Sequence, residues 1–109
     1  MNANFEEQFE EQIESITAQI IKKYNPDKII LFGGAARGEV TADSDADFLI
    51  IKKNTPHYGA DRIRELSRLI DREIAVDFLV YRTDELEKRL SMGDPFLKGI
   101  IKEGKVLYG

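Results

Sequence analysis

The part of this sequence that most constrains the fold is residues 28–51, KIILFGGAARGEVTADSDADFLII. An apolar run over residues 29–32 ends at Gly33-Gly34, and Asp45-Ala46-Asp47 opens a second apolar run. Residues at i and i+2 of a strand lie on the same face, because side chains alternate with a period of two. Two carboxylates so close together raise each other's pKa unless a cation lies between them. The pattern therefore predicts a divalent metal site beside a glycine turn that can receive phosphate.

Hydrophobic periodicity predicts alternating helices and strands along the whole chain. We expect helices over residues 5–24, 61–70, 83–90 and 95–103, a short helix over 35–37, and strands over 28–32, 45–52, 73–81 and 105–108. The strand over 28–32 is apolar throughout, which is typical of a central strand buried on both faces. The predicted fold class is α+β with mixed α/β character, a small mixed sheet flanked by helices. A length of 109 residues predicts a single domain over 1–109.

Two helices carry a clear apolar stripe. The first is formed by Phe5, Phe9, Ile13, Ile16, Ile20 and Tyr24, and the second by Ile63, Leu66 and Ile70. At the helix ends, Thr83 is the expected N-cap of one helix and Asp94-Pro95 opens the next, which Gly104 ends.

A third carboxylate, Asp77, lies within the strand over 73–81. Val76, Phe78 and Val80 are expected to face the core, so Asp77 lies on the opposite face. If this strand pairs with the strand over 45–52, Asp77 can lie next to Asp45 and Asp47.

Two other kinds of structure can place aspartates at this spacing, a solvated strand start and a calcium loop. Aspartates often flank strands simply as solvated residues, but Asp47 precedes Phe48-Leu49-Ile50-Ile51 and so lies inside the strand pattern. A calcium loop of the EF-hand type requires glycine after Asp47 and glutamate at its twelfth position. Phe48 and Asn54 occupy these positions, so a calcium loop is excluded.

Composition excludes several classes of protein. The net charge is −4, so the chain lacks the broad basic surface needed for nonspecific nucleic-acid binding, and no nucleic-acid partner is expected. There are no cysteines and one histidine, which excludes disulfides, thiolate chemistry and multi-histidine metal sites. No run resembles a signal peptide or is long enough to span a bilayer, so no membrane association and a cytoplasmic location are expected.

The segments Leu31-Phe32-Gly33-Gly34-Ala35-Ala36-Arg37-Gly38 and Asp43-Ser44-Asp45-Ala46-Asp47-Phe48 resemble the signature of the polymerase-beta-like nucleotidyltransferases. The similarity is strongest to their smallest branch, the minimal nucleotidyltransferase (MNT) domains. It extends over nearly the whole chain, with Asp77 matching the third acid. Most small members carry serine where this chain has Gly34, so a hydroxyl contact to phosphate is missing. The resemblance implies a fold like the palm of polymerase beta.

The resemblance also implies two-metal nucleotidyl transfer from a nucleoside triphosphate. Asp45, Asp47 and Asp77 would be the catalytic residues and would hold two Mg²⁺ ions, with ATP as the substrate. Asp77 would also accept the proton of the acceptor hydroxyl. Gly33 and Gly34 would hold the β- and γ-phosphates.

Arg37 and Ser44 are further candidates for nucleotide and phosphate binding. For Arg37, an ion pair with Asp43 or Asp45 that holds the loop is the favoured alternative. For Ser44 it is capping of the turn. His57 and Tyr58 lie in a loop, where base stacking and simple surface exposure are both open.

In the family, minimal domains commonly pair with a small helical HEPN-type protein as antitoxin and toxin. The resemblance therefore implies transfer of AMP to a hydroxyl of such a partner. A nucleotide-binding antitoxin that neutralises its partner by contact, with little turnover, is the second hypothesis. Assembly into a homo-oligomer stays open.

Overall fold

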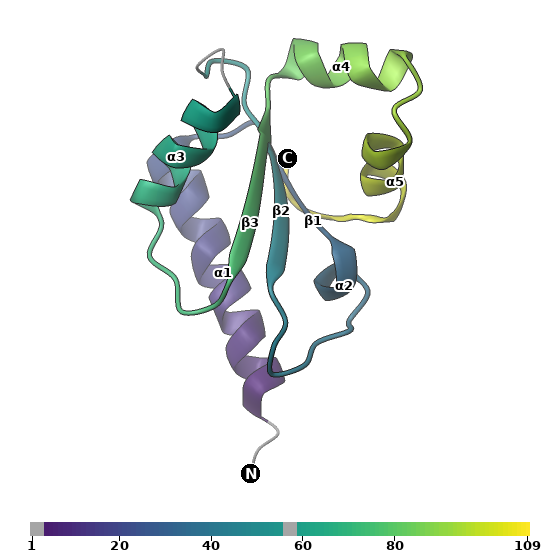
Figure 1. Cartoon of the computed structure of the whole chain (residues 1–109). Coiled ribbons are helices and arrows are strands. Elements are labelled where there is room, and N and C mark those ends of the chain that lie inside the picture. Colours follow the sequence, from purple (N-terminus) through teal and green to yellow (C-terminus); the bar gives the residue numbers. More distant parts are fainter. Residues whose placement is uncertain (1–3, 56–58) are drawn as a thin grey trace.

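A four-stranded mixed sheet organises the chain in the computed structural model, which describes residues 4–55 and 59–109 (Figure 1). The elements in chain order are α1 (Asn4–Tyr24), β1 (Lys28–Phe32), α2 (Gly33–Ala36), β2 (Ala46–Ile51), α3 (Gly59–Leu69), β3 (Val76–Tyr81), α4 (Thr83–Ser91), α5 (Pro95–Glu103) and β4 (Lys105–Tyr108). The strand order is β3-β2-β1-β4, so β1 and β2 are central as expected for apolar strands. The predicted fold class is confirmed.

The sheet is mixed because its strands pair in two orientations. β1 runs antiparallel to both β2 and β4, whereas β2 and β3 are parallel. The parallel pair is joined through α3, the crossover that parallel strands require. This arrangement brings β3 beside β2, as the placement of Asp77 near Asp45 and Asp47 requires.

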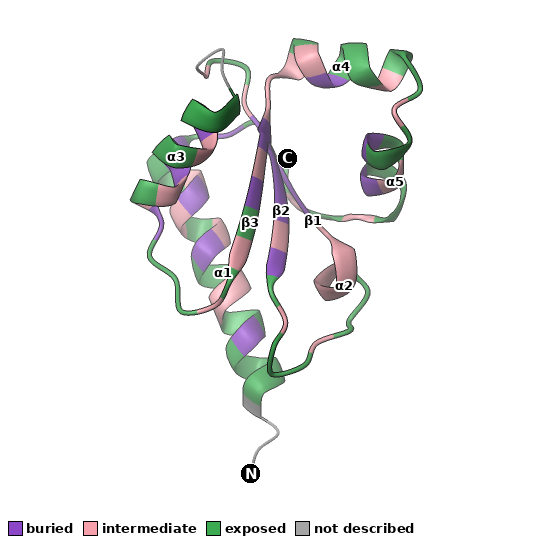
Figure 2. Cartoon of the chain, viewed as in Figure 1, coloured by how far each residue is buried: buried purple, intermediate pink, exposed green. Residues whose placement is uncertain are grey.

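Helices α1 and α3 cover one face of the sheet (Figure 1). Phe9, Ile16 and Ile20 of α1 and Leu66 of α3 pack there with the strand residues that alternate onto this face, Ile29, Leu31, Ala46, Phe48, Ile50, Phe78 and Val80. The expected alternation of strand faces is therefore confirmed. The buried stripe of α1 is visible in Figure 2, although Phe5 at its start is exposed.

The opposite face is covered only in part. Leu86 of α4 and Leu97 and Ile100 of α5 pack on Ile30, Leu49 and Ile51. Asp77 on this face is exposed and Asp47 is half-buried, so within the described residues this end of the sheet is open to solvent. That open end is where the candidate site lies.

Several local predictions need correction. α2 begins at Gly33 rather than Ala35, because Phe32 leaves the strand directly into the turn. α4 begins at Thr83, so the expected N-cap is wrong by one residue; the backbone N–H of Arg82 donates to Glu85 instead. Asp94 does cap α5 by accepting from the backbone N–H groups of Phe96 and Leu97.

Helix α3 differs more substantially from its predicted stripe. Leu66 and Ile70 are buried as expected, but Ile63 is only half-buried. Arg62 is 2% exposed and donates to the carbonyl of Val80 and, at 2.6 Å, to the carboxylate of Glu85. The buried guanidinium thus links α3, β3 and α4. No helix within residues 4–55 and 59–109 has the length and apolar character needed to cross a membrane.

Candidate active site

Three aspartates converge at the open end of the sheet. One carboxylate oxygen from each of Asp45, Asp47 and Asp77 lies within 4.8 Å of the other two. Asp47 and Asp77 are direct neighbours in the register of the parallel pair β2–β3, and Asp45 immediately precedes β2. Asp45 and Asp47 share a face because they are two residues apart, and Asp77 shares it because it pairs directly with Asp47. Asp47 and Asp77, which are 30 positions apart in the sequence, are thus brought together by the pairing of β2 with β3.

The electrostatics of this cluster are unfavourable without a cation. The pKa of Asp47 is raised to about 6, mainly by partial burial and in addition by the negative charges of Asp45 and Asp77. Carboxylate oxygens are the ligands that Mg²⁺ prefers. The cluster therefore has the donor set and the unrelieved charge that suit a divalent cation.

The backbone of Gly33 lies against this cluster. Its φ of +73° is a conformation that glycine adopts readily, and a Cβ atom there would lie 2.5 Å from Oδ2 of Asp47. A side chain is therefore excluded at this position for two separate reasons. Gly34 differs, because a Cβ atom there would meet its nearest neighbour, the carbonyl of Glu39, at 3.6 Å.

An aromatic wall borders the acids. Phe32, Asp47 and Asp77 lie in one row across β1, β2 and β3. The Phe96 ring of α5 contacts Phe32 edge to face, with 6.0 Å between the ring centroids. A cavity of about 520 Å³ includes all four residues in its lining. The site thus combines carboxylates with an apolar surface.

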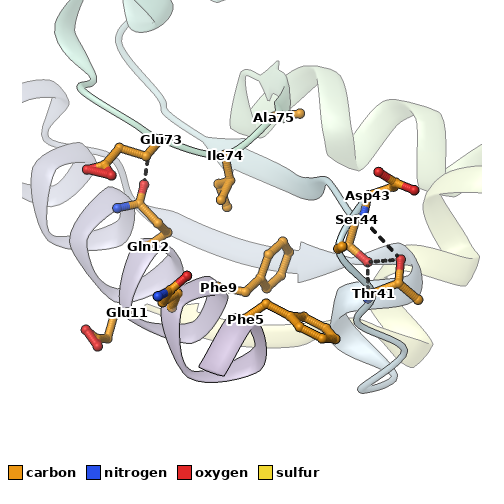
Figure 3. A pocket seen from close by; sticks show the side chains of 12 residues that line it. Phe5, Phe9, Glu11, Gln12, Thr41, Asp43, Ser44, Glu73, Ile74 and Ala75 are labelled. Carbon is orange, nitrogen blue, oxygen red and sulfur yellow. Dashed lines mark hydrogen bonds between the residues drawn. The ribbon is translucent and has the colours of Figure 1, made fainter. Parts of the chain in front are cut away.

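A cavity of about 660 Å³ lies elsewhere, between the start of α1, the 41–44 turn and residues 73–75 (Figure 3). Phe5, Phe9 and Ile74 form its apolar part, and none of the three clustered aspartates lines it. Its volume exceeds that of the cavity at the acids, but the only group of potential metal ligands found within residues 4–55 and 59–109 is the three aspartates. We therefore place the candidate site at the acids.

The family model described as Polymerase beta, Nucleotidyltransferase matches residues 11–109. This chain belongs to that family. The resemblance found in the sequence is thereby confirmed at the level of the family.

Three known proteins are similar to this nucleotidyltransferase chain. "Putative protein adenylyltransferase MJ0604" of Methanocaldococcus jannaschii is 33% identical over 81 residues, which are 74% of this chain and 77% of that protein. "Putative protein adenylyltransferase MJ1305" of the same organism is 34% identical over 89 residues, 73% of this chain. This chain spans only 56% of the length of the latter.

The crystal structure of "a putative nucleotidyltransferase from Sulfolobus solfataricus" has the same fold. It matches 90% of this chain and 83% of its own, with a TM-score of 0.56 and 24% sequence identity. The fold expected for a nucleotidyltransferase is therefore present here.

The structure brings Arg37 and Ser44 into local contacts rather than into the acid cluster. Arg37 pairs with Glu39 at 3.3 Å, not with Asp43 or Asp45, because its exposed side chain reaches the carboxylate two residues ahead. Ser44 closes the turn by accepting the backbone N–H of Thr41 at 2.7 Å. His57 and Tyr58 lie outside the described residues. Phe96 was missed, since no local pattern marks an exposed phenylalanine on α5 as a neighbour of the acids.

Proposed function

We propose that this nucleotidyltransferase-family protein transfers AMP from ATP to a hydroxyl group of a protein partner. The observation that carries the proposal is the convergence of Asp45, Asp47 and Asp77 within 4.8 Å, beside the glycine turn. The names of the two Methanocaldococcus relatives support AMP as the group and a protein as the acceptor.

Asp45, Asp47 and Asp77 are the residues that would hold two Mg²⁺ ions. Bound there, the ions would supply positive charge to the phosphate oxygens of the nucleotide. The raised pKa of Asp47 supports this assignment, because a bound cation relieves the repulsion among the three carboxylates. Both the ions and ATP are thus expected to bind at the open end of the sheet.

The chain's own groups have separate tasks in the transfer. Backbone N–H groups of Gly33 and Gly34 hold the β- and γ-phosphates, since a backbone without side chains can approach them closely. The acceptor oxygen bonds to the α-phosphorus as the bond from that phosphorus to the bridging oxygen breaks. Pyrophosphate leaves, and the carboxylate of Asp77 takes the proton of the acceptor hydroxyl. Arg37 and Ser44 act on the nucleotide only through the loop that they hold.

The biological setting in this proposal is an antitoxin that modifies a small helical HEPN-type toxin. Only the resemblance to minimal nucleotidyltransferases supports this part. A second candidate is an antitoxin that binds nucleotide and neutralises its partner by contact. The observation that favours it is Gly34, because the hydroxyl that serine supplies in most small members is missing.

The test uses the purified protein with Mg²⁺, α-labelled ATP and the product of an adjacent gene that encodes a small helical protein. Transfer predicts that the partner gains the mass of AMP, and that Asp45→Asn with Asp47→Asn abolishes both this gain and rescue from toxicity. Asp43→Asn is the matched control, because Asp43 is an exposed carboxylate in the same loop but outside the cluster. Rescue that survives in the double variant would support neutralisation by contact instead.

A further inference from the structure

Strand β3 lies at one edge of the sheet and carries Asp77. The backbone N–H of Ala46 donates to the carbonyl of Ala75, and that of Lys52 donates to the carbonyl of Tyr81. Residues 75, 77, 79 and 81 therefore direct their backbone groups toward β2. Because these directions alternate along a strand, Val76, Phe78 and Val80 direct theirs outward.

Most of these outward groups have no hydrogen-bond partner in the part of the chain that the structure describes. The carbonyl of Val80 accepts from buried Arg62. Within residues 4–55 and 59–109, no hydrogen bond engages the outward N–H and C=O groups of Val76 and Phe78, and no strand pairs with this side of β3. Directly beside Asp77, the sheet thus offers two unused donors and two unused acceptors.

The two edges of the sheet are protected differently. β4 is four residues long, begins with Lys105, and its pairing with β1 is interrupted by a register shift. Short length, lysine and irregular register are devices that prevent an edge from pairing with another chain. β3, with the sequence VDFLVY, contains neither lysine nor proline and pairs in unbroken register over its six residues. Over residues 76–78, its outer edge is therefore open to an added strand.

A groove crosses this edge. The 520 Å³ cavity runs from Ile63 and Ser67 of α3, past Val76 and Phe78, to Asp77, Leu79 and Phe96 on the opposite face. A chain lying along β3 would thus have side-chain space on both faces. An added strand normally gains its affinity from the backbone bonds and its selectivity from such spaces.

We propose that an extended segment of the acceptor protein pairs with the outer edge of β3 and presents its hydroxyl residue opposite Asp77. This rests on the proposed transfer of AMP. Directly opposed residues on neighbouring strands have Cβ atoms about 4.5–5.5 Å apart and side chains on the same face. The residue opposite Asp77 therefore brings its hydroxyl to the carboxylate that accepts its proton. Its oxygen then bonds to the α-phosphorus while pyrophosphate leaves with the electron pair of the broken bond.

The experiment uses three pools of seven-residue peptides with a fixed central Ser, Thr or Tyr and mixed flanking residues, at saturating ATP and Mg²⁺. Addition of AMP is measured by mass. Peptides that are modified are then resynthesised with a single N-methyl group at each position in turn. A paired strand predicts loss of modification at every second position, because alternate N–H groups face β3. Uniform loss, or loss without alternation, would overturn the proposal.

A variant of this protein, rather than of the peptide, also tests pairing at the outer edge of β3. Of the backbone hydrogen-bonding groups of β3, Val76→Pro removes only the outward N–H of residue 76. This residue is the first of an edge strand, a position where proline is tolerated. Val76→Ala is the comparison, because it shortens the same side chain and keeps the N–H. We expect Val76→Pro to lower modification about tenfold relative to Val76→Ala. Equal modification by the two variants would contradict the proposal. The N-methyl series decides the question if Val76→Pro does not fold.

The outcomes separate this inference from the proposed function. AMP transfer to a folded partner, with no peptide of any pool modified, would overturn the edge-docking proposal alone. Modification that persists after Asp45→Asn with Asp47→Asn would overturn the proposed catalytic role of the acids.

Discussion

Gly33 lies so close to Asp47 that a Cβ atom on the glycine would approach the carboxylate Oδ2 to 2.5 Å. The glycine turn and the acid cluster are therefore one structural unit. A change in either part is expected to disturb the other.

Gly33→Ala is expected to destabilise the fold and to displace the carboxylate of Asp47. The positive φ costs a non-glycine residue about 1–2 kcal/mol, which urea unfolding can measure. The contact with Asp47 should in addition abolish AMP transfer. Gly38→Ala is the matched control, because φ is +77° there but no atom lies within 4 Å of the added Cβ. If Gly38→Ala lost transfer equally, strain alone would explain the effect.

The raised pKa of Asp47 predicts an unusual dependence of stability on pH. Its value of about 6 in the fold lies above the ordinary 3.8, so the folded protein binds more protons than the unfolded chain between these values. The contribution of Asp47 to the free energy of unfolding is therefore greatest below about pH 4 and declines as the pH rises to about 6. Relative to wild type without metal, Asp47→Asn should gain stability over this range. Urea midpoints at several pH values, in a chelator, test the difference.

Mg²⁺ should restore the stability that the wild type loses as the pH rises to about 6. A ligand that binds only the folded state stabilises it by mass action, so the thermal midpoint of the wild type at neutral pH should rise with Mg²⁺ concentration. Asp47→Asn should respond much less, since it removes one of the three carboxylates proposed to bind the ions. An equal rise in both proteins would place the ions elsewhere.

Glu85→Ala should be far more damaging than the loss of a surface ion pair. Glu85 is bonded at 2.6 Å to Arg62, whose side chain is 2% exposed, so its removal weakens the compensation of a buried charge. We expect a loss of about 2 kcal/mol in the free energy of unfolding. Arg64→Ala breaks the exposed pair with Asp61 and should change stability by less than about 0.5 kcal/mol. Comparable losses in the two variants would contradict this account of Arg62.

Gly34→Ser restores the hydroxyl that most small members of the family carry. The structure has room for the side chain, because the nearest atom would lie 3.6 Å from the added Cβ. The variant should fold at least as stably as the wild type and lower the KM for ATP in steady-state assays. Gly34→Ala separates the hydroxyl from the loss of backbone freedom. A KM that is unchanged in Gly34→Ser would mean that the added hydroxyl makes no contact with the phosphates.

Much of the local structure was predictable because it depends on neighbours in the chain. Asp47 and Leu49 lie on the face of the sheet opposite to Phe48 because side chains alternate along an extended backbone. Asp94 caps α5 because it accepts from the backbone N–H groups that directly follow it. The predictions for Arg37 and Thr83 failed at a finer level, because several short polar contacts of similar energy compete there.

The amino-acid sequence by itself determined where the helices and strands lie, and that Asp45 and Asp47 share a face, since both depend on backbone geometry over a few residues. Only the tertiary structure decided that β2 and β3 run parallel and adjacent, that Asp77 thereby meets the pair, and that Arg62 is buried against Glu85. It also decided that Phe96 lies beside Phe32 and that β3 keeps a free edge. These features depend on which distant elements pack together, and no local period encodes that choice.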